Sequence, residues 1–540
     1  MVAETPGPMK CTSLMVALLA SACGGGRADA PADAPADGPP DAAVDPEPTT
    51  VVSLTFDDTR ADQYQVGAMV AARQMRATFY VNSSRLGREG YMTREQLGAL
   101  QAQGNEIGGH SLAHVYLSTL DSDAARREVC DDRVALLAAG LEASTFAYPF
   151  GDESTGLRRI AALCGYTAAR DSGGLVTGSH CADCPLAEQM PPVDAFDINS
   201  ISSIASTATL EDLEQYVLQA EAAGGGWVPL VFHRVCDGCS DSSVTAATLS
   251  AFLDWLAARR SGGTAVQTVA QVMGGAVQPG TAGPLPGPGA NLVPNPSLEL
   301  DGNRDEVPDC WHRRGSGTND ATYALVDGAF DGAIAQQISI TSYTDGTRRL
   351  LTRPECPVPT RPGRAYRITS WYVADTPPRF AVYYRNAAGI WLSLAQSPPF
   401  PTSPTYVEAT YTTPPLPADA TAISVGMSIA AVGTLTMDAF SATDPSVTVG
   451  DPPVVAMAGL VDGATVSDVV TLAARASGAG GIDHVDFRVN DRLEDWDDAE
   501  PFAIPWDTTR LHRGAYVITA RAFDRAGNVT TSPAITVTVP

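Results

Sequence analysis

The sequence predicts three folded domains, an α/β barrel followed by two β-rich domains. The first observation is length, because 540 residues at ~100–200 residues per domain correspond to about three domains. The second is the alternation of short apolar strands with helix-like segments over residues 51–276, which is typical of a parallel α/β barrel. The third is a pair of breaks, a Pro/Gly-rich segment at 277–290 and a shorter one near 443–453, which leave domains at 291–445 and 451–540.

The composition is that of an acidic globular protein. Hydrophobic residues make up 44% of the chain, which excludes wholesale disorder. The 35 basic and 61 acidic side chains give a net charge of −26. Such a surface repels phosphate backbones and anionic lipid headgroups, so no nucleic-acid partner is expected, and contact with a membrane is expected only through a lipid anchor. We expect a monomer.

The first 23 residues have the pattern of an export signal. Lys10 precedes the apolar run Leu14–Ala20, which is too short to span a bilayer and leads to small residues before Cys23. This arrangement resembles a bacterial lipobox, which implies that Cys23 becomes the lipidated first residue of a protein held at the outer membrane or cell surface. The alternative is that Cys23 belongs to the signal and that cleavage nearby gives a secreted protein. Residues 24–50 repeat Ala-Asp-Ala-Pro and are expected to form an extended, solvated tether.

Eight cysteines follow the signal, an even number that fits a disulfide framework in an exported protein. Cys130 with Cys164 and Cys310 with Cys356 are candidate bridges. We expect disulfides also at the two Cys-x-x-Cys pairs, which are Cys181/Cys184 and Cys236/Cys239. The alternative for these two pairs is a four-thiolate zinc ribbon, for which a separation of about fifty residues is long.

In the first domain, predicted strands and helices follow one another. A buried strand at Val51–Phe56 is followed by a helix around Ala61–Gln74. The later elements are a strand at Ala77–Val81, a helix at Thr93–Gln103 and strands at Glu106–Gly109, Thr145–Tyr148, Tyr166–Ala169 and Val228–Phe232. Chemistry in parallel barrels gathers at the carboxyl ends of the strands, so polar residues directly after strands are the candidates for a site.

Two carboxylates and three histidines lie at such strand ends. Asp57 and Asp58 follow the first strand, where one can bind a metal and the other act as a base, although a surface Asp pair capping a helix is a common alternative. His110 and His114 have the i, i+4 spacing that puts two imidazoles on one helical face, as metal ligands require. His233 ends the last strand and can act as an acid from another direction. Two histidines and one carboxylate leave coordination positions open, as a hydrolytic metal needs.

Four segments resemble, in order, the motifs of the polysaccharide deacetylases, the NodB-homology carbohydrate esterases of family 4. They are Thr55-Phe-Asp-Asp58, His110-Ser-Leu-Ala-His114, Phe146-Ala-Tyr-Pro-Phe-Gly151 and Leu230-Val-Phe-His233. The resemblance spans about 51–275 and implies a distorted (β/α)7 barrel. It also implies a set of roles, with Asp57 as general base, His233 as general acid, and Asp58, His110 and His114 as metal ligands.

The resemblance implies deacetylation with one divalent ion, Zn²⁺ in the first instance and Co²⁺, Ni²⁺ or Mn²⁺ as alternatives. Such an ion lowers the pKa of a water molecule towards neutrality. Asp57 then accepts the proton, and His233 protonates the departing amine or alkoxide. The turn of the third motif, Tyr148-Pro149-Phe150, is expected to bind substrate, with a backbone N–H near Phe150 stabilising the oxyanion.

The third motif departs from the commonest family pattern. Many members have Arg two residues before the Pro, where this chain has Ala147, and the Phe-Ala-Tyr-Pro form looks like the branch that includes exopolysaccharide poly-N-acetylglucosamine deacetylases. Arg170, which ends the next predicted strand, is a candidate to supply that charge beside Asp57 and so to serve catalysis. The alternative is an ordinary surface Arg. The acidic partner of the catalytic His is open among Asp171, Asp194 and Asp197.

Both C-terminal domains are predicted to be β-sandwiches. The second resembles jelly-roll carbohydrate-binding modules in its opening Asn291–Glu299 and Pro308–Trp311, and its alternating segments are Ala365–Val373, Phe380–Tyr384 and Ile423–Ile429. Aromatic rings stack on sugars, so the candidates to line a cleft, unless they fill the core, are Trp371, Tyr383, Tyr384 and Trp391. The third domain ends in a hairpin at 515–529 and resembles bacterial immunoglobulin-like modules, to which we assign no chemistry.

These features predict a metal-dependent hydrolase that removes acetyl groups from an N- or O-acetylated polysaccharide at the cell surface. The candidate substrates are peptidoglycan, chitin oligomers, poly-N-acetylglucosamine exopolysaccharide and acetyl-xylan. One alternative is another metal-dependent amide or ester hydrolase on the same barrel. A second is an inactive adhesin that binds glycans, which the presence of both Asp57 and His233 disfavours.

Overall fold

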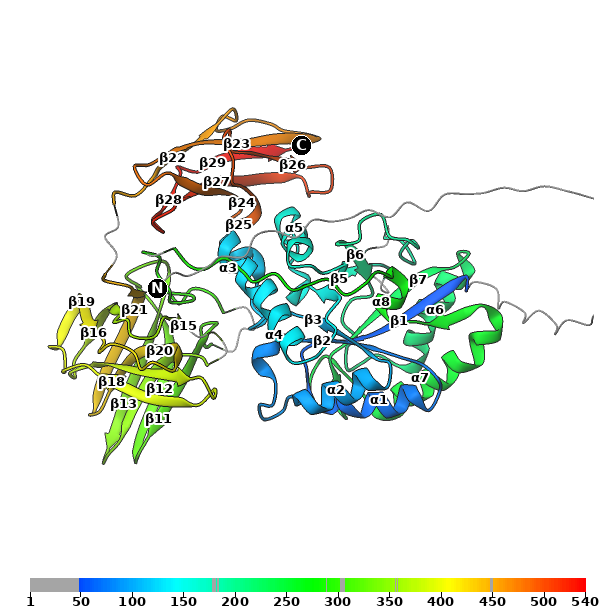
Figure 1. Cartoon of the computed structure of the whole chain (residues 1–540), viewed down its shortest axis with the longest axis horizontal. Helices are drawn as coiled ribbons and strands as arrows, with labels where there is room; N and C mark the ends of the chain where they lie inside the picture. The colour runs from blue at the N-terminus through cyan, green and yellow to red at the C-terminus, as the bar shows by residue number, and fades with distance from the viewer. Residues whose placement is uncertain are drawn as a thin grey trace, which may run out of the picture. The chain divides into compact units, whose positions relative to one another are not determined.

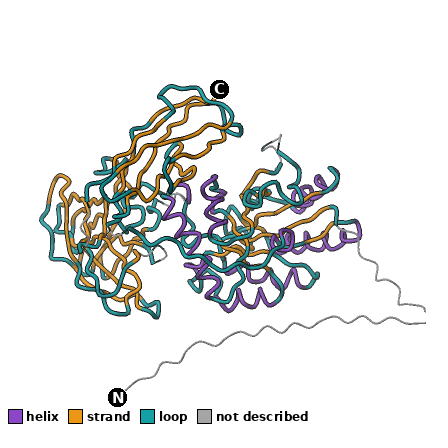
Figure 2. The backbone as a smooth tube through the Cα atoms, turned by 45° about the horizontal axis from the view of Figure 1, so that its top comes forward, coloured by secondary structure: helices purple, strands orange, loops and turns teal. Residues whose placement is uncertain are grey.

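The computed structural model describes residues 48–176, 181, 184–287, 289–301, 306–354, 356, 358–446 and 450–540. The predicted signal with its lipidation site Cys23, and the predicted tether as far as residue 47, lie outside these ranges. In the described part of the chain, helices occur only between residues 61 and 273, and the remainder consists of strands and loops (Figure 2). No helix among the described residues combines the length and apolar character needed to cross a bilayer.

The first domain is a nearly closed barrel of seven parallel strands, as predicted (Figure 1). The strand order is β7-β1-β2-β3-β4-β5-β6, and β10 pairs with the first half of β1. Between β6 and β7 the amides of Ile201 and Ile204 donate to carbonyls of β7, each at 2.9 Å. The strands are β1 (Thr50–Phe56), β2 (Thr78–Val81), β3 (Glu106–Gly109), β4 (Thr145–Ala147), β5 (Ala168–Gly174), β6 (Ile198–Ser200), β7 (Gly226–Phe232) and β10 (Thr264–Val266), with a short pair β8 (Arg234–Val235) and β9 (Ser243–Val244) beside them.

Helices connect the barrel strands and bury their apolar stripes against them. In α2, for example, Leu97 and Leu100 are buried, and a capping box between Thr93 and Gln96 fixes the first turn. The helices are α1 (Tyr64–Ala71), α2 (Arg94–Ala102), α3 (Ser122–Arg126), α4 (Asp132–Ala138), α5 (Thr155–Leu163), α6 (Leu210–Ala222), α7 (Ala246–Arg259) and α8 (Val269–Met273). Shorter turns of helix are η1 (Ala61–Gln63), η2 (Ser83–Arg85), η3 (Leu117–Thr119), η4 (Arg127–Asp131), η5 (Pro149–Gly151) and η6 (Arg260–Gly262).

One predicted strand is placed differently by the structure. The expected strand Tyr166–Ala169 begins later, at Ala168, and continues as β5 to Gly174. Tyr166 instead follows the turn that ends α5, where its ring packs on Phe146. Arg170 therefore lies inside a strand rather than at its end, which turns its side chain into the barrel instead of into solvent.

The second domain is a sandwich of two antiparallel sheets. The first has the order β11-β14-β20-β17-β18 with β15 paired to β20, and the second has the order β12-β13-β21-β16-β19. Phe380, Met427 and Ile338 are among the residues that form its core. The strands are β11 (Trp311–Ser316), β12 (Asn319–Asp327), β13 (Ile334–Tyr343), β14 (Thr347–Thr352), β15 (Val358–Pro359), β16 (Arg367–Ala374), β17 (Arg379–Asn386), β18 (Trp391–Gln396), β19 (Ser403–Thr412), β20 (Ala420–Ile429) and β21 (Gly433–Thr443).

The four aromatic residues expected to line one cleft do not share a surface. Trp371 lies on the five-stranded sheet, where it stacks on Phe330 with ring centroids 3.8 Å apart. Tyr384 packs against the core of the sandwich. Tyr383 and Trp391 share the outer face of the other sheet, because strand register alternates side chains between the two faces.

The third domain is a smaller sandwich with sheets β22-β23-β26 and β25-β24-β27-β28, the latter with β29 paired to β27. Leu472, Phe487 and Trp506 lie in its core. The predicted hairpin at its end is formed by β27 and β28. The strands are β22 (Val454–Ala458), β23 (Val469–Ser477), β24 (Ile482–Val489), β25 (Arg492–Asp497), β26 (Ala503–Asp507), β27 (Gly514–Asp524), β28 (Val529–Thr531) and β29 (Ile535–Val539).

Four disulfides join the eight cysteines that follow the signal. They are Cys130–Cys164, Cys181–Cys184, Cys236–Cys239 and Cys310–Cys356. Each Cys-x-x-Cys pair closes on itself, so its sulfur atoms are not free thiolates that could form a zinc ribbon. The structure thus has disulfides where the sequence left zinc as an alternative.

Candidate metal centre

The centre begins where β1 ends. Ladder hydrogen bonding continues for one residue beyond the strand, because the Asp57 amide donates to the Phe232 carbonyl at 2.9 Å. Asp58 and Thr59 then adopt left-handed backbone angles, with φ of 77° and 62°, which break the extended conformation. The adjacent carboxylates of Asp57 and Asp58 consequently face different partners, although both are buried.

The Asp58 carboxylate lies between two histidines. Its Oδ1 atom is 2.9 Å from His114 Nε2 and 3.8 Å from His110 Nε2, and one ligand atom from each of the three residues falls within 4.8 Å of the others. Asp58 Oδ1 is buried and forms no hydrogen bond with any residue that the structure describes. A carboxylate and two imidazoles are donors that suit Zn²⁺ and related divalent ions.

The tautomer of His110 fits a metal ligand. His110 Nδ1 lies 2.8 Å from the Ala147 carbonyl oxygen, which can only accept, so Nδ1 carries the proton and Nε2 presents its lone pair towards Asp58. Burial lowers the pKa of His110 to about 4, which keeps this imidazole neutral at pH 7. A buried lone pair facing a buried carboxylate leaves room for a cation, so these residues fit a divalent ion.

The segment between the two histidines is a turn rather than the expected helix. Ser111 and His114 have positive φ angles of 64° and 60°. Glu128 accepts the amides of Leu112, through its backbone carbonyl, and of Ala113, through its side chain, both at 2.9 Å. These bonds replace the helical ones, and the turn brings the two rings to a centroid distance of 4.8 Å. The two histidines are therefore brought together by this turn and not by the periodicity of a helix.

Burial would raise the pKa of the Asp58 carboxyl, but its neighbours His114, His233 and Arg85 hold it well below its usual range. Arg85, whose guanidinium lies 3.8 Å from Asp58 Oδ1, contributes in the same direction. Asp58 is therefore ionised near neutral pH. An ionised carboxylate is the form that binds a metal.

Arg170 is the partner of Asp57. Its Nη2 atom lies 2.5 Å from Asp57 Oδ1, and its side chain is fully buried. Register places Arg170 on β5 beside Ala147 on β4, and register partners on neighbouring parallel strands point to the same face. The guanidinium thus approaches Asp57 from the level at which the third motif lacks an arginine, and it lies 4.9 Å from the centre of the Tyr80 ring.

This pairing sets the charge of Asp57. Burial raises the pKa of the Asp57 carboxyl, but the positive charge and hydrogen bond of Arg170, with smaller contributions from His110 and His233, lower it below the ordinary value. The carboxylate is therefore available to accept a proton near neutral pH. Arg170 is fully buried, so it is not the ordinary surface arginine that the sequence left as the alternative.

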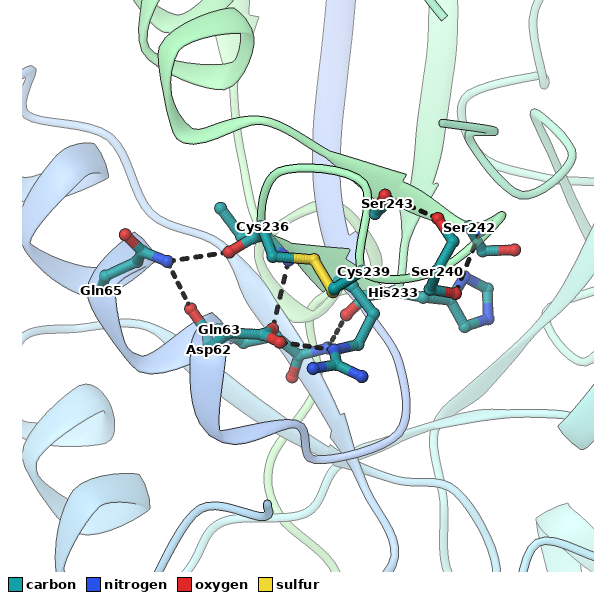
Figure 3. The surroundings of a disulfide bond; sticks show 11 residues. Asp62, Gln63, Gln65, His233, Cys236, Cys239, Ser240, Ser242 and Ser243 are labelled. Carbon is teal, nitrogen blue, oxygen red and sulfur yellow. Dashed lines mark hydrogen bonds and ion pairs between the residues drawn. A yellow bond between two sulfur atoms is a disulfide. The ribbon is translucent and has the colours of Figure 1, made fainter. Parts of the chain in front are cut away.

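His233 enters the site from β7, and Gln63 connects it to Asp57. The Gln63 amide is fully buried, and its Nε2 atom donates to the carbonyl oxygen of His233 at 2.5 Å (Figure 3). The same atom donates to the Asp57 carbonyl oxygen, also at 2.5 Å. One side chain from η1 thus joins the ends of β1 and β7. Gln63 could not be recognised from the sequence, because only its burial distinguishes it from the other polar residues of this helical segment.

The loop that follows His233 is closed by the Cys236–Cys239 disulfide (Figure 3). Asp62 lies beside it and forms an ion pair with Arg234 and accepts the Val235 amide at 3.1 Å. An oxygen atom of Asp62 and the two sulfur atoms lie close together, but sulfur atoms in a disulfide are not thiolate ligands. The group therefore anchors the loop that carries His233.

None of the three candidate acidic partners contacts His233. Asp194 and Asp197 form ion pairs with Arg158, and Asp171 accepts the amide of Ser172. His233 Nδ1 is buried and has no hydrogen-bond partner among the described residues. The expectation that Asp171, Asp194 or Asp197 is the acidic partner of His233 is therefore wrong in this structure.

The third motif forms a turn at the edge of the centre. Tyr148 is buried, with its hydroxyl donating to the Phe196 carbonyl at 3.0 Å, and Pro149 is buried beside it. Phe150 has a left-handed φ of 61° and a side chain that is 42% exposed. Its ring meets His114 edge-on at 4.4 Å and stacks on Tyr116 at 4.1 Å. Of this turn, only Phe150 presents its side chain at the mouth of the site.

Two family models match parts of the chain. Residues 45–169 match the family model described as polysaccharide deacetylase, and residues 453–520 match the one described as bacterial Ig domain. The chain therefore contains a polysaccharide deacetylase domain followed by an Ig-like domain. No curated protein matches the chain significantly.

Among solved structures, the chain is similar to the family 4 carbohydrate esterase from Streptomyces lividans in complex with acetate, with 16% identity over 40% of this chain and 91% of that one and a TM-score of 0.28. It is also similar to the peptidoglycan deacetylase PdaC from Bacillus subtilis, with 20% identity, coverage of 42% and 90%, and a TM-score of 0.27. A third is TmCBM61 in complex with β-1,4-galactotriose, with 15% identity, coverage of 28% and 98%, and a TM-score of 0.21.

Proposed function

We propose that this protein is a metal-dependent hydrolase that removes acetyl groups from an N- or O-acetylated polysaccharide. We further propose that it acts at the cell surface, exported and lipidated through Cys23. The observation that carries the activity is the juxtaposition of two groups, the Asp58–His110–His114 donor set and the Asp57–Arg170 ion pair. Their residues come from β5 and from the loops that follow β1 and β3, in a domain of which residues 45–169 match the deacetylase family model.

Asp58, His110 and His114 would hold the divalent ion, which when bound acidifies water and polarises a carbonyl group. Asp57 does not belong to this donor set, because its Oδ1 atom is paired with Arg170 at 2.5 Å. With its pKa lowered, Asp57 stays ionised and accepts the proton of the attacking water. Arg170 holds this carboxylate in place and acts as a positioning residue.

His233 supplies a proton to the departing group. An amine or alkoxide leaves poorly as an anion, so a positioned acid is needed on the opposite side from the base. His233 comes from β7, whereas the other two histidines come from the loop after β3. Gln63 fixes the backbone of His233 relative to Asp57, so acid and base keep a defined separation.

Phe150 forms the edge of the substrate site. Its left-handed backbone turns the 149–151 segment at the rim, where a backbone N–H can stabilise the negative charge that develops on the acetyl oxygen. Its exposed ring, stacked on Tyr116, offers an apolar surface to the face of a sugar ring. This arrangement suits an acetylated glycan better than a small charged amide.

Acetate release tests the proposal. The purified full chain, loaded with Zn²⁺ or Co²⁺, is incubated with peptidoglycan, chitin oligomers, poly-N-acetylglucosamine and acetyl-xylan, and acetate is quantified. We expect release from at least one glycan, and Asp57→Asn is expected to lower turnover by roughly 10²–10⁴-fold while metal stays bound. Near-normal release by Asp57→Asn would exclude Asp57 as the base, and release from none of the four by the metal-loaded protein would contradict deacetylation of these glycans.

A further inference from the structure

The two sheets of the second domain carry opposite charges. The strands of the first sheet, β11, β14, β15, β17, β18 and β20, contain six arginines and no Asp or Glu, the arginines being Arg313, Arg314, Arg348, Arg349, Arg379 and Arg385. The strands of the other sheet contain one arginine and four acids, which are Arg367, Asp320, Asp327, Glu408 and Asp438. The chain as a whole has a net charge of −26, so strands with arginines and no acidic residue depart from its overall composition.

Register gathers four of these arginines on one face. Arg314 pairs with Arg349, Arg349 with Ser428, and Ser428 with Arg379, so three guanidinium groups lie in one row across four strands. At about 4.8 Å between strands, this row is about 14 Å long. Arg385 lies further along β17 on the same face.

Two aromatic rings share this face with the arginines. Trp391 is the register partner of Arg385, whose guanidinium lies 6.0 Å from the ring centre. Tyr383 lies beneath Arg349, with 5.8 Å between guanidinium and ring centre, and its hydroxyl accepts a hydrogen bond from Arg349. Between the arginines and the two rings, the surface of the sheet is formed by the small residues Ala381, Ala422, Ser424, Gly426 and Ser428. We call this surface, with Arg314, Arg349, Arg379, Arg385, Tyr383 and Trp391, the arginine face.

The charge of the arginine face is not neutralised within the described part of the chain. Its guanidinium groups bond to neutral oxygen atoms: Arg349 to Thr347 Oγ1 at 2.7 Å, Arg379 to the Ser397 carbonyl at 3.2 Å and Arg385 to Thr421 Oγ1 at 3.0 Å. No described carboxylate forms an ion pair with them or with Arg314. Arginines held by neutral partners keep further N–H groups for an external anion.

The pKa of a nearby histidine, His312, is lowered by the same positive charges. His312, two residues before Arg314 on β11, lies on this face because it pairs with Leu351, two residues from Arg349. Burial, together with the positive charges of Arg314, Arg353 and, from the first domain, Arg88, lowers the pKa of His312 to about 4. The imidazole therefore stays neutral, as expected where the potential is already positive.

We propose that the arginine face binds an anionic polysaccharide, one whose sugar residues carry carboxylate groups. Guanidinium groups recognise carboxylates bidentately, and the rings of Tyr383 and Trp391 provide surfaces on which sugar rings stack. A row of charges across four strands suits an extended polymer rather than a single small anion. The choice of a glycan over another polyanion rests on the proposed function of the barrel, since a module on the same chain would hold the enzyme on its polymer.

Duplex nucleic acid fits this surface less well. It carries one charge per ~1.7 Å of axis, so the remaining acidic surface of the chain would repel it strongly. A polysaccharide with one carboxylate on each sugar or on alternate sugars has a lower charge density and exposes the ring faces that the two aromatic side chains need.

Binding is tested by calorimetry on the purified full chain with polygalacturonate, with the same polymer after its carboxyl groups are reduced to alcohols, and with duplex DNA. We expect binding to polygalacturonate that weakens as salt rises, and weaker or no binding to the other two. The double variant Arg349→Gln/Arg379→Gln should lose about tenfold in affinity, which corresponds to about 1.4 kcal/mol. Arg314→Gln, whose side chain is exposed, should lose affinity in the same direction without disturbing the fold. The matched control is Arg367→Gln, an exposed arginine on the opposite sheet.

Equal affinity for the reduced polymer, equal affinity for DNA, or undiminished binding by both the double variant and Arg314→Gln would overturn the proposal. The binding result is independent of catalysis, because Asp57→Asn leaves the arginine face intact. Retained polygalacturonate binding by a chain that releases no acetate would contradict the proposed activity alone. Acetate release without such binding would contradict the arginine face alone.

Discussion

Arg170 Nη2 lies 2.5 Å from Asp57 Oδ1, inside a barrel whose third motif has alanine where many deacetylases have arginine. The positive charge is therefore present, but it comes from β5 instead of β4. The two positions are register partners on neighbouring strands, so they lie at the same level of the barrel. The positive charge beside Asp57 thus comes from β5 and not from the third motif.

Removing this charge should change the pH dependence of catalysis. Arg170 lowers the pKa of Asp57, so Arg170→Ala raises it, and the base is then ionised only at higher pH. We expect turnover to fall by roughly 10–10²-fold and the acidic limb of the pH–rate profile to move upward by about one unit, with unchanged metal content. Arg170→Lys retains the charge and should restore the limb towards its original position. An unchanged profile in Arg170→Ala would show that the pair does not tune the base.

We expect Asp58, His110 and His114 to be the residues that bind the divalent ion. His110→Ala/His114→Ala removes two of three ligands, so elemental analysis of the dialysed protein should show the divalent ion lost. His512→Ala, an exposed histidine of the third domain, is the matched control and should retain it. Full metal retention by the double variant would mean that the ion is held elsewhere.

Gln63 should matter for rate more than for substrate binding. Gln63→Met keeps length and burial but removes both hydrogen bonds, leaving the carbonyls of Asp57 and His233 unpaired. We expect kcat to fall by roughly tenfold, with KM and metal content near normal and a stability loss of about 1–3 kcal/mol. Gln65→Met changes a neighbouring exposed glutamine and should leave kcat unchanged. A variant that loses only stability would make Gln63 a structural residue.

Glu153 should make the protein less stable as pH rises. Burial, opposed by Arg158 at 2.7 Å, raises its pKa to about 7, above the value of ~4.3 expected in the unfolded chain. The folded state thus binds the proton more tightly, so stability is fully present below pH 4 and is lost as pH rises through 7. Glu153→Gln should remove this part of the pH dependence and be more stable than the native chain above pH 7 by about 1–2 kcal/mol. Denaturant titrations at pH 5 and pH 8 measure this difference, with Glu142→Gln as an exposed control, and equal slopes with pH for all three proteins would contradict it.

Much of the fold follows from local sequence. Strand β3 occupies the residues expected for it, and β1 differs by a single residue, because a buried parallel strand is a continuous apolar run bounded by turns. The predicted end of β5, at Ala169, was wrong, because the strand continues to Gly174. Residues 171–174 are polar or glycine and have no strand pattern. Only pairing with β6 makes that segment extended.

The sequence by itself determined most of the barrel strands and the residue types that follow them, because hydrophobic periodicity and short motifs are properties of neighbouring residues. It did not reveal the short strands β6 and β10. The tertiary structure alone decided which partners those residues meet. Arg170 faces Asp57, Gln63 joins Asp57 to His233, and the arginines of the second domain share one face. The contacts of Arg170 with Asp57 and of Gln63 with His233 join residues 113 and 170 positions apart, and their positions depend on strand register and barrel closure, which no local pattern encodes.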